Sequence, residues 1–208
     1  MPQKTLISID IFSDVICPWC FIGKRRLEQA IAHHGGVEVK ITWRAFLLNP
    51  AMRRQGMDRQ AYIDAKFGQA GASFYERISG VGKQVGIDFD FAAITKTPDS
   101  RPAHSLVLSA NHQADAVKQA LFDAYFLQGR DIGDDQVLKE IADTFGLDYP
   151  ANQTVFDQID RDLSEANRLN IQGVPFFIIA GEWALSGAHP PETFMPLFDA
   201  AIAKATSA

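Results

Sequence analysis

The chain has 208 residues, and 47% of them are hydrophobic, which is enough to bury a core as one large domain or as a domain with an insertion. Its 25 acidic and 20 basic residues give a net charge of -5, which argues against partners such as nucleic acid or an anionic membrane surface. No run approaches the roughly 18 uninterrupted apolar residues of a membrane-spanning helix. The first segment, MPQKTLISIDIFSDV, lacks the apolar region and cleavage site of a signal peptide, so we expect a cytoplasmic protein.

The first predicted elements are a strand and a helix that meet at a pair of cysteines. Residues 5–12, TLISIDIF, are rich in β-branched and aromatic side chains and predict the strand. From Pro18 onward apolar residues recur at helical spacing, and proline favours the first helical position, which places Cys17 at or beside the N-cap. Because a helix N-terminus favours an anion, we expect the pKa of Cys17 to lie below that of a free cysteine. Cys20, one turn later, is expected to be more buried and within reach of Cys17.

The remaining elements follow from the same patterns. A second strand is predicted at residues 37–46, after the segment HHGG ends the first helix. Glycine and proline residues then separate helical pieces at roughly 58–85, 100–114, 115–128, 134–145 and 151–168. The segment VPFFIIAGEWALSG (174–187) predicts a hairpin, and a last helix is expected at about 191–204. We therefore predict an α/β fold in which residues 1–48 and 171–208 form one domain and residues 49–170 form an inserted helical domain.

Cys17 and Cys20 are the only cysteines of the chain, in the motif CPWC. In a reducing cytosol, such a close pair is more often catalytic or metal-binding than a structural disulfide. The same spacing provides half of many zinc sites, but the second half is missing, because the five histidines show no ligand spacing to one another or to the pair. A zinc ion would have to recruit scattered histidines or bind across a dimer. We therefore favour a redox couple and predict no metal.

Four further residues are candidates with open alternatives. Trp19, inside the motif, is either an exposed substrate contact or a ring packed on the start of the helix. Pro175 starts an apolar strand, where the residues alone favour an ordinary trans proline. His104, in SRPAHSLVLSANH, falls in the first turns of a predicted helix and on the residues alone is either a helix residue that touches the domain boundary or a functional histidine. Ser186, in SGAHPPE, contacts a substrate or belongs to a plain turn.

Three segments, SDVICPWCFIGKRRLE, LFDAYFLQGRDIGD and GVPFFIIAGEWALSGAHPPE, resemble the DsbA-like thioredoxin superfamily, and specifically its cytoplasmic FrnE-like branch. The resemblance covers nearly the whole chain. It implies a thioredoxin-like fold with a large helical insertion, a reactive pair at Cys17 and Cys20, and a cis-proline facing that pair at Pro175. Relatives include 2-hydroxychromene-2-carboxylate isomerase and kappa-class glutathione transferases, in which a serine typically replaces the nucleophilic cysteine. This chain departs from that pattern because it keeps both thiols.

The activity that the resemblance implies is thiol–disulfide exchange without a metal or an organic cofactor. Cys17 would form a mixed disulfide with a protein or small-molecule substrate, and Cys20 would resolve it. A cis bond before Pro175 would turn the backbone of Val174 toward that substrate, with Trp19, His104 and Ser186 as further contacts.

Glutathione is a candidate co-substrate, and two other functions stay open. One is a glutathione-dependent isomerase or transferase for aromatic or polyketide-like substrates, which would survive the loss of Cys20. The other is a non-catalytic metal- or protein-binding module.

Overall fold

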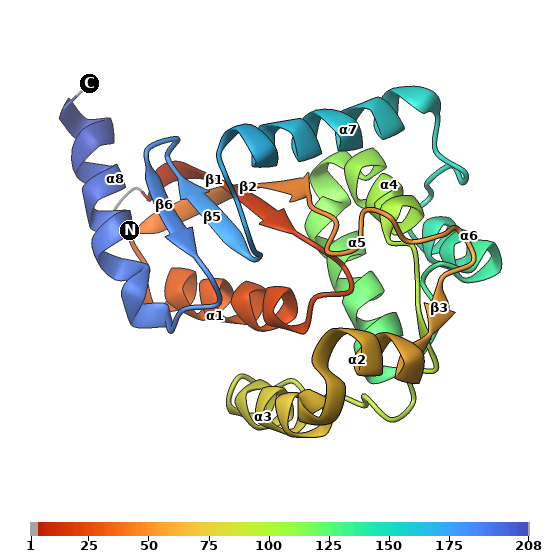
Figure 1. Ribbon diagram of the computed structural model, residues 1–208. Coiled ribbons are helices and arrows are strands. Elements are labelled where there is room, and N and C mark those ends of the chain that lie inside the picture. Colours follow the sequence, from red (N-terminus) through yellow and green to blue (C-terminus); the bar gives the residue numbers. More distant parts are fainter. Residues whose placement is uncertain (1–3, 208) are drawn as a thin grey trace.

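The computed structural model describes residues 4–207, which form a mixed helix and sheet structure (Figure 1). Four strands form one sheet in the order β2-β1-β5-β6, and two short strands, β3 and β4, form a second sheet. The strand bounds are β1 (Thr5–Ser13), β2 (Val37–Ala45), β3 (Met57–Asp58), β4 (Lys96–Thr97), β5 (Phe176–Ile179) and β6 (Trp183–Ser186). The helix bounds are α1 (Pro18–His34), α2 (Arg59–Phe67), α3 (Gly71–Gln84), α4 (Arg101–Ser109), α5 (Ala114–Phe122), α6 (Asp135–Thr144), α7 (Gln153–Arg168) and α8 (Met195–Ser207).

The four-stranded sheet joins the beginning of the chain to its end. β1 runs parallel to β2, with α1 as the crossover between them, and antiparallel to β5, the first strand of the β5–β6 hairpin. Successive side chains of a strand point to opposite faces, so Phe177 and Ile179 enter the large core, whereas Phe176 and Ile178 pack beside α7. In Figure 1, α1 and α8 lie along one side of the sheet and α7 lies along the other. The predicted α/β class is confirmed.

A continuous hydrophobic core connects this sheet to the helices between β2 and β5. Phe21 of α1 stacks on Phe122 of α5, with ring centroids 4.9 Å apart and planes 9° apart. The same ring meets the edge of Phe89, with ring centroids at 5.9 Å. Ala166 of α7 packs in a smaller cluster on the sheet. The helical residues therefore pack directly on the α/β part, and the proposed domain boundaries at residues 49 and 170 stay a prediction.

The helices differ in detail from the sequence-based expectation. The piece expected at 58–85 is divided into α2 and α3 by a 3-10 turn, Gly68–Ala70, because Gly68 adopts a φ of +54° that a continuing helix cannot use. Just before α2, the residues of β3 pair with those of β4, an interaction too short to have a sequence signature. The piece expected at 115–128 ends in a π-helix, Asp123–Leu127. Within residues 4–207, no helix has the length and apolar character needed to cross a membrane.

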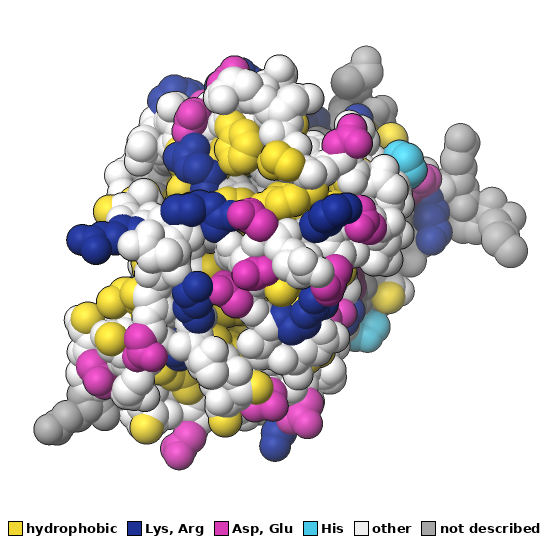
Figure 2. Space-filling model, turned by 90° about the vertical axis from the view of Figure 1, so that its right-hand side faces the viewer, with side chains coloured by type: hydrophobic (Ala, Val, Ile, Leu, Met, Phe, Trp, Pro, Cys, Tyr) yellow, Lys and Arg dark blue, Asp and Glu magenta, His cyan; other side chains and the backbone are white. Residues whose placement is uncertain are grey.

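Figure 2 shows the side of the molecule that lies at the right in Figure 1. Basic and acidic side chains are interspersed over this face, with hydrophobic side chains between them. Several charges in the helical part are paired, such as Arg101 with Asp160 at 2.7 Å and Arg130 with Glu140 at 2.5 Å. This side of the molecule therefore presents no large surface of one sign.

Candidate active site

Cys17 is the N-cap residue of α1, as the sequence predicts. Its backbone is extended, with φ −96° and ψ 111°, and Pro18 occupies the first turn of the helix. The carbonyl oxygen of Cys17 accepts hydrogen bonds from the amides of Cys20 at 3.0 Å and Phe21 at 3.4 Å, which start the helix. The Cys17 side chain thus stands at the positive end of a helix of 17 residues.

Both cysteines are free thiols, and both are buried, with 4% of Cys17 and 1% of Cys20 exposed. The Sγ of Cys17 lies 3.6 Å from the carbonyl oxygen of Val174. The Val174–Pro175 peptide bond is cis, which confirms the form that the family resemblance implied. Pro175 also packs closely on α1, because a Cβ added at Gly23 would lie 2.7 Å from its Cγ atom. The fold therefore brings together the two cysteines and the start of β5.

The two thiols share a proton in a way that the sequence did not anticipate. A hydrogen bond with Cys20, followed by burial, raises the pKa of Cys17 well above its ordinary value. Burial also opposes ionisation of Cys20, but hydrogen bonds from Cys17 and Ser13 and the charge of Lys118 together lower the pKa of Cys20. In the reduced pair, the raised pKa of Cys17 therefore differs from the lowered pKa expected at a helix N-terminus, because Cys20 carries the first negative charge. The first ionisation belongs to the pair rather than to one residue.

Asp14, in the turn between β1 and α1, is fully buried, and its carbonyl oxygen accepts a hydrogen bond from the amide of Cys17 at 3.2 Å. One carboxylate oxygen accepts hydrogen bonds from the amide of Ile16 and from Nε2 of His104, both at 3.3 Å. The other accepts from the amide of Leu48 at 2.7 Å. Burial would raise the pKa of Asp14, but the interactions with His104 and Leu48 outweigh it and lower the pKa. Asp14 is thus a charged residue whose oxygens are already occupied.

The structure places the other predicted site residues at different depths. His104 is buried, with 2% exposed, and is connected to the cysteine turn through Asp14, so its predicted role as a substrate contact remains a prediction. Trp19 is half-buried and packs against the core. Ser186 is exposed at the end of β6, next to Gly187, whose amide donates a 2.8 Å hydrogen bond to the carbonyl oxygen of Pro175. Of these three residues, only His104 is buried.

Lys118 is a residue near the pair that sequence reasoning missed. It belongs to α5 and is 1% exposed, with its Nζ 3.5 Å from the carbonyl oxygen of Ser13. The Nζ also lies 5.1 Å from the ring centroid of Trp43 and 5.3 Å from that of Phe122. Burial lowers the pKa of Lys118 to about 8, against the opposing attraction of Cys20. A lysine in an amphipathic helix is expected on the solvated face, and no sequence signal marks this one as buried.

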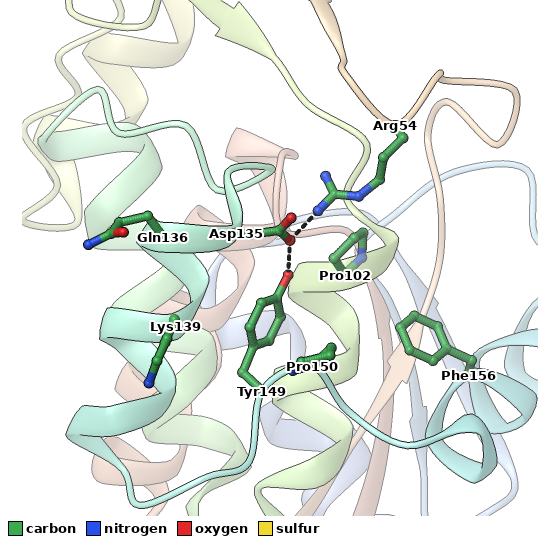
Figure 3. A pocket seen from close by; sticks show the side chains of 8 residues that line it. All are labelled: Arg54, Pro102, Asp135, Gln136, Lys139, Tyr149, Pro150 and Phe156. Carbon is green, nitrogen blue, oxygen red and sulfur yellow. Dashed lines mark hydrogen bonds and ion pairs between the residues drawn. The ribbon is translucent and has the colours of Figure 1, made fainter.

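The hollow shown in Figure 3 lies among the helices and is separate from the cysteine pair. It has a volume of about 540 Å³, and its lining includes Arg54, Asp135 and Tyr149. Asp135 accepts hydrogen bonds from both other side chains, from Tyr149 Oη at 2.5 Å. These three polar side chains of the hollow therefore satisfy one another. In the part of the chain that the structure describes, no three His, Cys, Asp or Glu side chains cluster closely enough to hold a metal ion.

The comparisons with known proteins agree with this geometry. Residues 8–198 match the family model of the DsbA-like thioredoxin domain. The uncharacterized protein YwbO of Bacillus subtilis is 26% identical over 201 residues, which cover 90% of this chain and 94% of YwbO.

Two solved structures share the fold. The probable DsbA oxidoreductase SCO1869 from Streptomyces coelicolor is 27% identical, with a TM-score of 0.83 over 95% of this chain and 90% of that one. The cytosolic disulfide reductase DsbM from Pseudomonas aeruginosa, solved with GSH, is 19% identical, with a TM-score of 0.60 over 96% of this chain and 98% of that one. The predicted thioredoxin-like fold is confirmed, and the chain belongs to the family of DsbA-like thioredoxin domains.

Proposed function

We propose that the chain is a thiol–disulfide oxidoreductase in which Cys17 and Cys20 form the redox couple. The observation that carries the proposal is the position of the two thiols, which lie together at the start of α1 with the Cys17 Sγ 3.6 Å from the Val174 carbonyl oxygen. Family membership and the likeness to a probable DsbA oxidoreductase support it. The FrnE-like subtype and a cytoplasmic location are part of the same proposal, and the shared fold of a cytosolic disulfide reductase is consistent with them.

The reaction begins with transfer of the shared proton. The Cys20 thiolate accepts the proton of Cys17, and the Cys17 thiolate attacks one sulfur of a substrate disulfide. The substrate S–S bond breaks, a mixed disulfide forms at Cys17, and the first substrate thiolate leaves. Cys20 then gives its proton to that thiolate and attacks the Cys17 sulfur, which forms the Cys17–Cys20 bond and releases the second substrate thiolate. In the opposite direction, a substrate thiolate attacks the Cys17–Cys20 disulfide.

The substrate is proposed to lie along the start of β5. The backbone of Val174 offers strand-like hydrogen bonding to an extended peptide or to a small peptide-like thiol, beside the buried ring of Pro175. Trp19 and Ser186 are placed on either side of this position in the proposal, on α1 and at the end of β6. Glutathione is a candidate small substrate, and the DsbM structure with GSH supports this choice.

Oxidised glutathione provides the test of this function. We expect the Cys20→Ser variant to retain one glutathione as a mixed disulfide at Cys17, and the Cys17→Ser variant to retain none, as measured by intact mass and peptide mapping. The wild-type protein should instead form the internal disulfide. Full catalytic turnover in Cys20→Ser would contradict the proposal and indicate the glutathione-dependent isomerase or transferase alternative, because that chemistry does not need a resolving thiol.

A further inference from the structure

Lys118 is a buried cation that has no dedicated counter-ion among residues 4–207. Asp14 is occupied by two backbone amides and His104. Asp115, one turn before Lys118 in α5, instead pairs with Lys24 of α1 at 3.1 Å. Among the described residues, no carboxylate forms an ion pair with Lys118, whose one hydrogen bond is the long contact with the carbonyl oxygen of Ser13. A buried ammonium group requires electrostatic compensation. With no permanent anion as its partner, the compensating group must be one that is charged in some states of the protein and neutral in others.

The cysteine pair is such a group. The Lys118 Nζ lies 3.5 Å from the carbonyl oxygen of Ser13, at the end of β1 that leads into the cysteine turn. At this position, a negative charge on Cys20 favours the charged form of Lys118, and the ammonium group favours the Cys20 thiolate. The hydroxyl of Ser13 is fully buried and has no hydrogen-bond partner among the described residues, whereas a thiolate at Cys20 would accept a hydrogen bond from it. Ser13 Oγ and Lys118 Nζ therefore both act on the Cys20 sulfur.

Five of the described titratable groups interact electrostatically with Lys118, and they come from the cysteine turn, α1, α4 and α5. They are Cys17, Cys20, Asp14, His104 and Asp115. Asp14 keeps its charge, the interaction with Lys118 opposes protonation of His104, and Asp115 is paired with Lys24. Only the two sulfurs change charge when the protein is oxidised or reduced, so the charge of Lys118 is expected to follow the redox state of the pair.

We propose that Lys118 is a positioning residue for resolution, which stabilises the Cys20 thiolate while it attacks the mixed disulfide and releases a proton once the Cys17–Cys20 bond has formed. This inference rests on the proposed function. Before the step, Cys17 is bonded to the substrate sulfur, Cys20 is a thiolate and Lys118 is an ammonium. The Cys20 sulfur bonds to the Cys17 sulfur, the bond from Cys17 to the substrate breaks, and the electron pair leaves with the substrate thiolate. Lys118 then faces a neutral disulfide and gives its proton through solvent to that thiolate.

The proposal gives the segment between β2 and β5 a part in the chemistry. Lys118 lies on α5, which also contacts β2 and carries Phe122 under the ring of Phe21. The same helix can therefore hold the ammonium group at a fixed position beside the start of α1. Loss of the thiolate charge removes an attraction that favours the charged amine, so the pKa of Lys118 should be lower in the oxidised protein than in the reduced one.

The test separates the two chemical steps with an aromatic disulfide, dithiobis-nitrobenzoate, whose thiolate product is coloured. Attack by Cys17 releases the first coloured thiolate, and attack by Cys20 releases the second. In Lys118→Met, the second phase should be slowed at least about tenfold at neutral pH, with its pH midpoint moved upward by about one unit. Lys24→Met is the matched control, because Lys24 is equally buried in α1 but has Glu28 and Asp115 as partners. Its second phase should stay within about twofold of the wild type.

The outcomes separate a failure of the proposed function from a failure of the role of Lys118. If the wild-type protein releases no second thiolate, the proposed function fails. If both phases occur in the wild type and Lys118→Met has the same second-phase pH midpoint, the role of Lys118 is wrong. Carbon NMR titration of the lysine side chains tests the same idea in the unmodified protein. A pKa of Lys118 that is unchanged between the reduced and oxidised states would also overturn it.

Discussion

The carbonyl oxygen of Val174 lies 3.6 Å from the Sγ of Cys17, although 157 positions separate the two residues in the sequence. Antiparallel pairing of β5 with β1 brings them together, because β1 leads directly into the cysteine turn and Val174 lies just before β5. The pairing of β5 with β1 thus determines the distance between the Cys17 Sγ and the Val174 carbonyl oxygen. Changes that move the start of β5 should alter the chemistry even if both cysteines remain.

Gly23 provides a direct way to move that segment. In Gly23→Ala, the new methyl group would lie 2.7 Å from Pro175 Cγ and 3.3 Å from the ring of Phe177. We expect a loss of about 1–3 kcal/mol in the free energy of unfolding and slower reaction with disulfides, because either α1 or Pro175 must shift. Urea denaturation and stopped-flow kinetics measure the two effects.

Gly80 is the matched control, because it also lies in a helix but has open space around its Cα. Gly80→Ala should leave the reaction unchanged and stabilise the protein by about 0.5–1 kcal/mol. Equal kinetics in Gly23→Ala and the wild type would show that the Pro175 contact does not influence the site.

The shared proton predicts two separated thiol ionisations in the reduced protein. Thiolate absorbance should show the first below the roughly 8.5 of a free cysteine, and the second well above it, because the hydrogen bond with Cys20 and burial raise the pKa of Cys17. Cys17→Ser and Cys20→Ser should each show a single ionisation. Two overlapping ionisations with the ordinary cysteine value in the wild type would contradict a shared charge.

His104 predicts a loss of stability in mild acid. Burial lowers its pKa below the ordinary 6.5, so below that pH the unfolded chain binds a proton that the folded chain does not. The free energy of unfolding should therefore fall as pH decreases from about 6.5, by at most about 1.4 kcal/mol per pH unit from this group. Chemical denaturation across this range should show that His104→Gln removes the decrease. His112→Gln, at an exposed position, should retain it.

Lys118 should lower the free energy of unfolding, although it is proposed to assist the reaction. Burial lowers its pKa from 10.5 to about 8, so at neutral pH the charged form costs the folded state about 3 kcal/mol relative to the unfolded chain. This cost disappears as pH rises from about 8 to 10.5. Over this range the folded lysine is already neutral, and the lysine of the unfolded chain loses its proton as well. Lys118→Met should raise the free energy of unfolding at neutral pH by most of that amount. A destabilised variant would show that the ammonium group is well compensated in the folded state.

The sequence predicted the parts of the site that depend on local pattern. Pro18 at the first helical position located Cys17 at the N-cap, and the segment from Val174 to Gly187 predicted the hairpin. The cis form of Pro175 came from family resemblance, because nothing in the residues themselves favours it over a trans bond. These predictions succeeded because each rests on a few neighbouring residues.

The missed features depend on contacts between distant segments. Lys118 has the sequence neighbours of a surface lysine, and it becomes buried only because α5 packs beneath β2 and the cysteine turn. The raised pKa of Cys17 also depends on such contacts. A helix N-terminus is visible in the sequence, whereas the hydrogen bond to Cys20 and the positions of Ser13 and Lys118 are visible only in the structure.

The central claim is that Cys17 and Cys20 act as one two-electron couple, and equilibration with mixtures of reduced and oxidised glutathione tests it most directly. The fraction oxidised would be measured by intact mass after acid quenching and alkylation of free thiols. We predict a single transition between a form with two alkylated cysteines and a form with an internal disulfide that has lost two hydrogen atoms, with glutathione adducts only as a minor species. Independent addition of glutathione to each cysteine, without an internal disulfide at any ratio, would contradict the account.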